Sequence, residues 1–205
     1  MGAMTETCGY TFDHPLFLAL NFDGGPAMDS VMTAVSGWVM WLPLYAAILG
    51  FVWYKHGWKT CVAFTACLFV AMGLADMLCG IFKHSGLLKN LWESFPPRWR
   101  PMFDPALAGK GVHVVSDHHG FYGTVSSHAA TVAAMALMSA LVIRRRWFTA
   151  AIVAVLLLVC YSRIYLACHY PMDLALGIVL GLAAGAAMFA LYKKMTSQIA
   201  KYAQK

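Results

Sequence analysis

Charged side chains are scarce in this 205-residue chain: 12% of its residues are Asp, Glu, Lys or Arg, whereas 60% are hydrophobic. Its mean hydropathy of +0.64 is too high for a soluble domain and indicates a polytopic membrane protein. Acidic residues are rarer still, with nine against fifteen basic ones. Because the basic residues gather in short segments between apolar runs, we interpret them as a sign of membrane topology and expect no nucleic-acid partner.

The chain also lacks the spacings that hold metals or build disulfide frameworks. Most of its six cysteines fall within apolar runs, where cysteine is a small core residue. One metal candidate, Asp117 with His118 and His119, lies in a polar stretch that we interpret as loop. We expect neither a metal nor a cofactor. Residues 1–27 have no basic start and do not resemble a cleaved signal peptide.

Five apolar runs are long enough to span a bilayer, at 31–54, 60–82, 121–143, 147–166 and 171–192. Pro43 in the first run predicts a kink. Gly177, Gly181 and Gly185 in the last run recur at intervals of four, which allows a neighbouring helix to approach closely. The sequence therefore predicts an all-α, polytopic transmembrane helix bundle of about five spans.

We expect three parts in this chain: an N-terminal interfacial segment, a transmembrane bundle with an outer polar loop, and a tail, at 1–27, 28–195 with 83–120, and 196–205. Residues 14–22 are too few to span the bilayer. Such a short apolar helix would lie along the interface, with Phe17, Leu18 and Phe22 in the lipid.

The basic segments orient the bundle. Lys55–Lys59, Arg144–Arg146 and the C-terminal tail contain no acidic residue, so the positive-inside rule places them in the cytoplasm. The 83–120 loop and the 166–171 turn then lie outside. We expect an integral protein of a bacterial inner membrane with an extracytoplasmic site; the oligomeric state stays open.

The stretch 162–173 (SRIYLACHYPMD) carries charges between two apolar runs, where charges are costly and usually functional. Pro171 suits the first turn of a helix, so His169 precedes a helix N-terminus, a position that favours anions. Asp173 is within reach of one imidazole nitrogen and can leave the other free as nucleophile or base. Arg163 offers a planar fork suited to phosphate oxygens. The alternative is an ordinary helix cap with juxtamembrane charges.

Four ionisable residues from four runs share one depth: Asp76, His128, Arg163 and Asp173. Counted along helices from the cytoplasmic basic residues, each lies roughly 24–30 Å up, near the outer face of a ~30 Å core. A transporter or channel would need polar residues at several depths, but the apolar runs contain almost no polar residues below this layer. We therefore favour a single outer site.

Two more clusters accompany this layer. Ser126 and Ser127 open an apolar run and either cap a helix or bind phosphate oxygens, while His128 can donate a proton. The second cluster contains the cations of the outer loop, which form either a solvated basic loop or an anion clamp: Lys83, Lys89, Arg98 and Arg100.

These clusters resemble the three signature motifs of the type 2 phosphatidic acid phosphatase superfamily, integral-membrane lipid phosphatases related in fold to vanadium haloperoxidases. Ser162, Arg163, His169 and Asp173 match the third motif fully. The second motif, Pro-Ser-Gly-His, corresponds to 125–128 (VSSH), which departs at the Pro and Gly positions.

The first motif, Lys, six residues, Arg-Pro, ends at Arg100-Pro101. Neither Lys83 nor Lys89 has that spacing, so an insertion separates the two halves. Lys83 matches the expected place at the end of a helix and is our first choice, whereas Lys89 is closer in spacing.

The resemblance implies a metal-independent lipid phosphatase with a phosphohistidine intermediate. His169 would attack phosphorus, Asp173 would fix its tautomer, and His128 would protonate the leaving oxygen and then activate water. The implied phosphate ligands are Lys83 or Lys89, Arg100, Ser126, Ser127 and Arg163. We further expect Asp76, which is outside the motifs, to pair with a site cation, Arg163 first and Lys83 second.

The substrate implied is a lipid phosphate at the outer leaflet. Undecaprenyl diphosphate is our first choice. The alternatives are a lipid A phosphate, phosphatidylglycerol phosphate and phosphatidate, and a phosphotransferase reaction through the same phosphohistidine.

Overall fold

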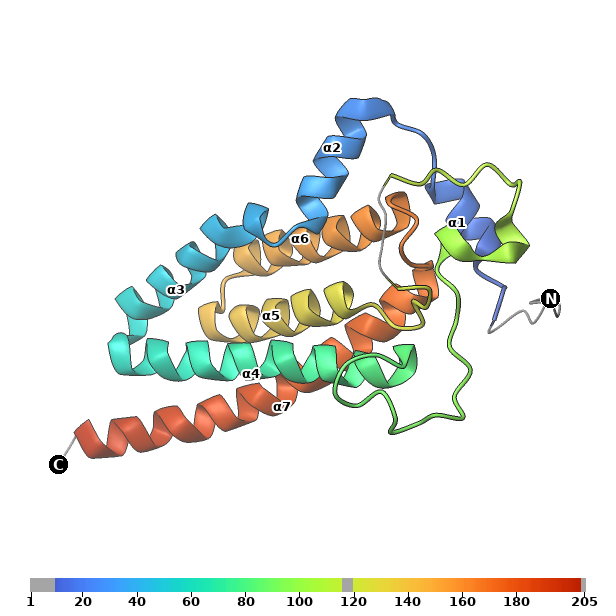
Figure 1. Ribbon diagram of the computed structural model, residues 1–205. Helices are drawn as coiled ribbons and strands as arrows, with labels where there is room; N and C mark the ends of the chain where they lie inside the picture. Colours follow the sequence, from blue (N-terminus) through green and yellow to red (C-terminus); the bar gives the residue numbers. More distant parts are fainter. Residues whose placement is uncertain (1–9, 116–119, 204–205) are drawn as a thin grey trace.

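The computed structural model describes residues 10–115 and 120–203, and the regular elements in these ranges are all helical (Figure 1). The α-helices are α1 (His14–Leu20), α2 (Gly25–Ser36), α3 (Leu42–His56), α4 (Trp58–Lys83), α5 (Ser127–Ile143), α6 (Arg146–Tyr165) and α7 (Pro171–Ala203). Three 3-10 helices join them, η1 (Val39–Trp41), η2 (Pro101–Phe103) and η3 (Pro105–Leu107). The predicted all-α class is confirmed.

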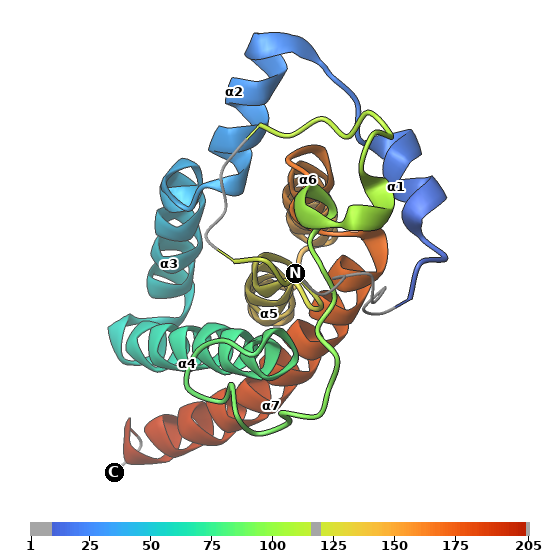
Figure 2. The same ribbon diagram turned by 45° about the vertical axis from the view of Figure 1, so that its right-hand side comes forward.

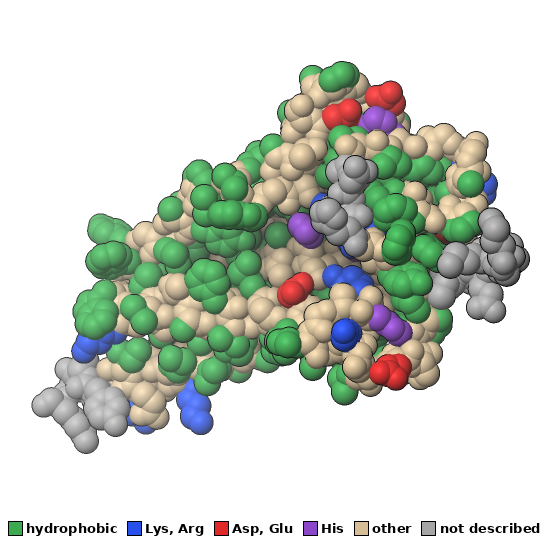
Figure 3. All heavy atoms as spheres, in the orientation of Figure 1, with side chains coloured by type: hydrophobic (Ala, Val, Ile, Leu, Met, Phe, Trp, Pro, Cys, Tyr) green, Lys and Arg blue, Asp and Glu red, His purple; other side chains and the backbone are tan. Residues whose placement is uncertain are grey.

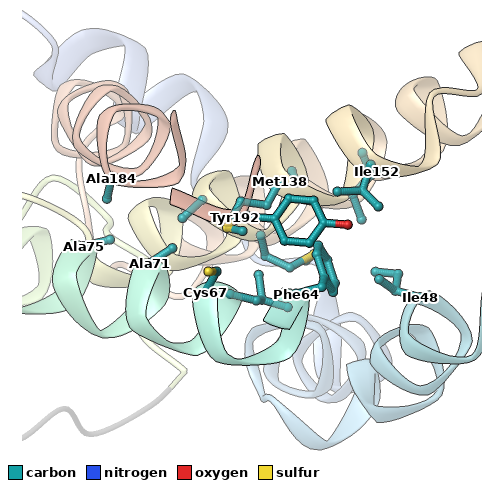
Figure 4. Close-up of a cluster of buried hydrophobic side chains, with 14 of the residues drawn as sticks. Ile48, Phe64, Cys67, Ala71, Ala75, Met138, Ile152, Ala184 and Tyr192 are labelled. Carbon is teal, nitrogen blue, oxygen red and sulfur yellow. The ribbon is translucent and has the colours of Figure 1, made fainter. Parts of the chain in front are cut away.

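Helix α5 is the centre of the bundle and packs against α4, α6 and α7 (Figure 2). Ala130, Ala133 and Ala134 of this helix are fully buried, because small side chains let three neighbours approach its backbone. Figure 4 shows the core on one side of α5, where Phe64 of α4 meets Tyr192 of α7 edge-on with ring centroids 5.9 Å apart.

The glycines of α7 face α5, as their spacing predicts. A Cβ on Gly177 would strike the carbonyl oxygen of Ser126, and one on Gly181 would strike that of Ala130. A Cβ on Gly185 would lie 3.1 Å from the carbonyl oxygen of Ala134, one turn further along α5. These contacts place the start of α7, and hence the site beside it, directly against the start of α5.

Adding one methyl group at this contact should destabilise the protein. We expect Gly181→Ala to lower the free energy of unfolding by about 1–3 kcal/mol, because the backbone of α5 must move. Gly73→Ala in α4 is the matched control: its Cβ meets nothing within 4 Å, so it should be neutral or stabilise by up to about 1 kcal/mol. Denaturant titration in detergent measures both; equal effects would contradict the close contact.

The membrane-spanning pattern differs from the predicted one in its first and third runs. Three helices, α4, α6 and α7, are long and apolar enough to cross a membrane, and α2 with η1–α3 passes the same test only as a pair that is bent by 69°. The bend follows Gly37, whereas Pro43 stands in the first turn of α3, where it fits without a kink. The kink predicted at Pro43 is therefore wrong.

Helix α5 begins at Ser127 instead of residue 121 and has 17 residues. At the other end of the chain, α7 runs on to Ala203, so residues 196–203 of the predicted tail are helical and continuous with α7. Helix α1 is present, but Phe17 is fully buried against Tyr170 instead of entering lipid, with ring centroids 5.3 Å apart.

Candidate active site

The loop between α6 and α7 holds His169 inside the protein. Ala167 adopts the left-handed conformation (φ 53°), which folds the chain back after α6. The backbone N–H groups of Cys168 and His169 then donate to the carbonyl oxygen of Arg163, at 2.9 and 3.3 Å. His169 is 2% exposed, so its ring position is fixed by its surroundings.

A short antiparallel contact brings the first and second motifs beside this loop. The Arg100 N–H donates to the Phe121 carbonyl at 2.8 Å, and the Gly123 N–H donates to the Arg98 carbonyl at 2.9 Å. The backbone N–H of Ser126 donates to the carbonyl of Asp173 at 3.0 Å. All three motifs therefore meet at the N-terminal end of α5.

The His169 ring is oriented by a main-chain carbonyl. Nδ1 lies 2.9 Å from the Gly123 oxygen and 3.7 Å from Asp173 Oδ2. A carbonyl only accepts, so Nδ1 carries the proton and Nε2 keeps its lone pair. The nearest hydrogen-bonding partner is thus Gly123, where we predicted Asp173; a Cβ on Gly123 would lie 3.2 Å from Nδ1.

The environment of His169 keeps its imidazole neutral. Burial lowers the pKa of His169 well below its usual 6.5, and the positive charges around it lower the pKa further. Those charges include Arg100, Arg163 and Lys83, and Arg100 Nη1 lies 3.3 Å from Nε2. A neutral ring surrounded by cations combines a nucleophilic nitrogen with a binding site for an anion.

Asp173 is fully buried but is shared with Arg98 instead of serving His169 alone. Its Oδ2 accepts the N–H of Tyr170 at 2.9 Å, and its Oδ1 accepts Arg98 Nη1 at 3.1 Å. Arg98 also forms an ion pair with buried Asp13 and lies against the Tyr170 ring, with its guanidinium carbon 3.7 Å from the centroid. The guanidinium group of Arg98 is therefore paired with two carboxylates of the protein and does not serve as a ligand for a bound anion. Its predicted place in the anion clamp is wrong.

Lys83 reaches the site and Lys89 does not. The last residue of α4, Lys83, donates from Nζ to Ser127 Oγ at 2.5 Å, whereas Lys89 is exposed in the following turn. Ser126 is fully buried and its hydroxyl accepts the Ala129 N–H at 3.4 Å, so it caps α5. The two serines thus have different roles: Ser126 caps the helix, and Ser127 lies beside the site lysine.

We expect Lys83→Met to lower kcat/KM for phosphate release by roughly 10²–10³-fold, because it removes a cation beside the phosphate. Lys89→Met is the matched control, and its activity should remain within about twofold of wild type, as expected for an exposed position. Phosphate-release kinetics of the two purified variants decide between the lysines. A loss confined to Lys89→Met would contradict the contact between Lys83 and Ser127.

Each of the two motif arginines is held by a hydrogen bond to another part of the protein. Arg100 is anchored by its Nε donating to the Gly120 carbonyl at 2.8 Å and by its Nη1 donating to the Cys168 carbonyl at 3.0 Å. Arg163, 3% exposed, donates to the hydroxyl of Ser36 in α2. Both guanidinium groups are thus preorganised near His169.

His128 and Asp76 line one hollow beside this centre, together with Ser127. Within the described residues no ion pair joins Asp76 to Arg163 or Lys83, although the charge of Asp76 acts on Lys83. Asp76 lines the hollow and Lys83 donates to Ser127, so the pairing of Asp76 with a site cation stays a prediction.

The metal candidate Asp117 with His118 and His119 lies outside the described residues. In residues 10–115 and 120–203, no group of His, Cys, Asp or Glu could hold a metal ion. Sequence reasoning also missed Asp13 and Gly123. Asp13 lies in the N-terminal segment and belongs to none of the three motifs. Gly123 contributes a main-chain oxygen, which its residue type does not reveal.

Residues 64–197 match the family model described as the PAP2 superfamily. The chain therefore belongs to this superfamily, as the three motifs predicted, and it is an integral-membrane lipid phosphatase. Among its relatives is a lipid A 4'-phosphatase of Bacteroides thetaiotaomicron, 30% identical over 91% of this chain and 80% of the relative. A second is a lipid A 4'-phosphatase of Porphyromonas gingivalis, 28% identical over 86% of this chain and 71% of the relative.

Two solved structures share the fold. Aquifex aeolicus LpxE has a TM-score of 0.63 at 19% identity, over 89% of this chain and 98% of that one. A phosphatidylglycerolphosphate phosphatase from Bacillus subtilis has a TM-score of 0.61 at 20% identity, over 91% of this chain and 85% of that one. At such identities the likeness concerns the fold alone.

Proposed function

We propose that this protein hydrolyses a phosphate monoester on a sugar of a lipid A-type glycolipid and releases inorganic phosphate. The observation that carries the proposal is the 30% identity with the Bacteroides lipid A 4'-phosphatase over 91% of the chain. Undecaprenyl diphosphate, our first choice from the sequence, has no such support among the relatives, two of which are lipid A phosphatases.

The geometry supports a double displacement. Nε2 of His169 forms a bond to phosphorus as the ester P–O bond breaks, and His128 gives its proton to the leaving oxygen. Water then attacks the phosphohistidine, His128 takes the proton, and the N–P bond breaks to release phosphate. Arg100, Arg163 and Lys83 neutralise the phosphoryl oxygens throughout.

Asp173 has an indirect part in this mechanism. Its charge lies 3.7 Å from Nδ1, where it stabilises the cationic ring that forms during attack, while the Gly123 carbonyl holds the proton. No step uses a metal, because cationic side chains surround the phosphate position.

A substrate panel tests this proposal. Purified enzyme in detergent is offered lipid A, undecaprenyl diphosphate, phosphatidylglycerol phosphate and phosphatidate, each with EDTA, and inorganic phosphate is measured. We expect the highest kcat/KM for lipid A. A higher kcat/KM for any other lipid would contradict the proposed substrate, and loss of activity in EDTA would contradict the metal-free mechanism. Transfer of phosphate to another lipid without release would identify a phosphotransferase.

We propose further that the site faces the extracytoplasmic side. Figure 3 supports this orientation: in this view the charged side chains at the C-terminal end of a broad apolar surface are all basic, whereas acidic and basic side chains are mixed at the opposite end, over α2 and the loop after α4. The positive-inside rule then assigns Arg144–Arg146 to the cytoplasm and the end of the bundle with His169 to the outside.

A cysteine at Arg145 should be shielded from an impermeant thiol reagent in intact cells and should be labelled only after lysis. The background is the protein with its native cysteines replaced, and a cysteine at exposed Lys110 in the outer loop is the control that should be labelled at once. The reverse labelling pattern would show that the site faces the cytoplasm.

A further inference from the structure

A hollow of about 330 Å³ opens beside the catalytic centre, between the bent α2–α3 pair, α4 and α5. On the face shown in Figure 3, a histidine, an acidic and a basic side chain gather around such a depression between α2 and α4. Its walls include Trp38, Trp41 and Tyr45 from the bent span, with Asp76 of α4 opposite. The volume falls in the range of small-molecule sites, roughly 300–1,000 Å³.

The position of His128 determines what occupies this hollow. His128 is the proposed donor to the leaving oxygen, and it lines the hollow together with Ser127. A general acid must be within hydrogen-bond reach of the atom that it protonates. The group attached to that oxygen, which is the leaving group of the reaction, therefore extends into this space.

Asp76 gives the hollow its chemical character. Within the described residues it has no ion pair, and its carboxylate is exposed on the surface that lines the hollow. A carboxylate accepts hydrogen bonds from hydroxyl and amide groups and repels anions. Aromatic walls with a hydrogen-bonding carboxylate suit a hydroxylated ring that has an apolar face.

We propose that this hollow is the leaving-group subsite and that Asp76 is a specificity-determining residue, which selects a neutral, hydroxyl- or amide-bearing sugar and disfavours a diphosphate. In a diphosphate the leaving group is itself a phosphate, which would bring a second anion to the Asp76 carboxylate. The proposal rests on the proposed function and refines it, because it names the part of the glycolipid that is recognised and the residue that recognises it.

The test compares wild type, Asp76→Asn and Glu93→Gln on two probes in the same detergent: lipid A and farnesyl diphosphate. Asp76→Asn should raise KM for lipid A by about tenfold or more, as expected for loss of a charged hydrogen bond, with a smaller change in kcat. It should also raise kcat/KM for the diphosphate. Glu93→Gln removes the same charge from an exposed loop residue and should change neither.

The ratio of the two kcat/KM values is the readout that a purely structural role would not move. If Asp76→Asn lowers both activities by the same factor, or behaves like Glu93→Gln, the proposal is overturned. Wild-type enzyme that hydrolyses only the diphosphate would overturn the proposed function separately. The inference about Asp76 would then be tested with the diphosphate alone. Faster hydrolysis of the diphosphate by Asp76→Asn than by wild type would support it, and an unchanged rate would overturn it.

Discussion

Replacement of His169 by alanine should abolish phosphate release, because no other described side chain presents a neutral, buried nitrogen to the cations of this site. His128→Ala should lower kcat by roughly 10²–10⁴-fold, the usual contribution of a general acid. The measurement is steady-state phosphate release from lipid A by enzyme purified in detergent. His56→Ala at the exposed end of α3 is the matched control and should remain fully active.

Labelled substrate provides a second readout of the same step. After a base quench, the wild-type protein should carry radioactive phosphate, and His169→Ala should carry none. Unchanged thermal unfolding must show that each variant is folded. Substantial turnover by a folded His169→Ala protein would eliminate the covalent intermediate, and label that persists in this variant would identify a different nucleophile.

Loss of Arg98 should have the largest effect on stability. Arg98→Met leaves Asp13 and Asp173 buried without their cation, at 4% and 0% side-chain exposure. Removing one partner of a buried ion pair typically costs ~3–5 kcal/mol. Denaturant titration should therefore show a large loss of unfolding free energy, and activity should fall because Asp173 and the His169 loop lose their support.

The double variant Arg98→Met with Asp13→Asn distinguishes pairing from packing. It should be less destabilised than the sum of the two single variants, because it leaves one fewer uncompensated charge. Lys110→Met, at an exposed position of the same loop, should be neutral. Strict additivity, or wild-type stability of Arg98→Met, would contradict the ion-pair network.

Sequence patterns located the site because its reactive side chains are confined to one depth. His128, Arg163 and Asp173 stand out as polar residues in apolar runs, and their shared depth, counted along the helices from the basic segments, follows from the helical rise. The same count gives height but not direction around a helix. The count therefore could not decide which cation Asp76 faces; its side chain lines a hollow, and Lys83 donates to Ser127.

Two other features could not be predicted from local patterns. The bend after Gly37 lies within a continuously apolar run, and hydropathy does not record backbone direction. The pairing of Arg98 with Asp13 joins residues 85 positions apart, and each alone resembles a solvated charge. Such contacts depend on how the N-terminal segment folds over the end of the bundle that holds His169, which no short motif encodes.

Because a main-chain oxygen holds the Nδ1 proton of His169, no change of side chain at position 123 deletes the accepting atom itself. A saturation mutagenesis map of this protein should therefore be intolerant at Gly123, where any Cβ would crowd Arg100 and His169, although glycine contributes no reactive group. Selection for altered substrates would be expected to leave this position unchanged while the walls of the hollow vary. The support of the nucleophile and the recognition of the substrate would then evolve independently of each other.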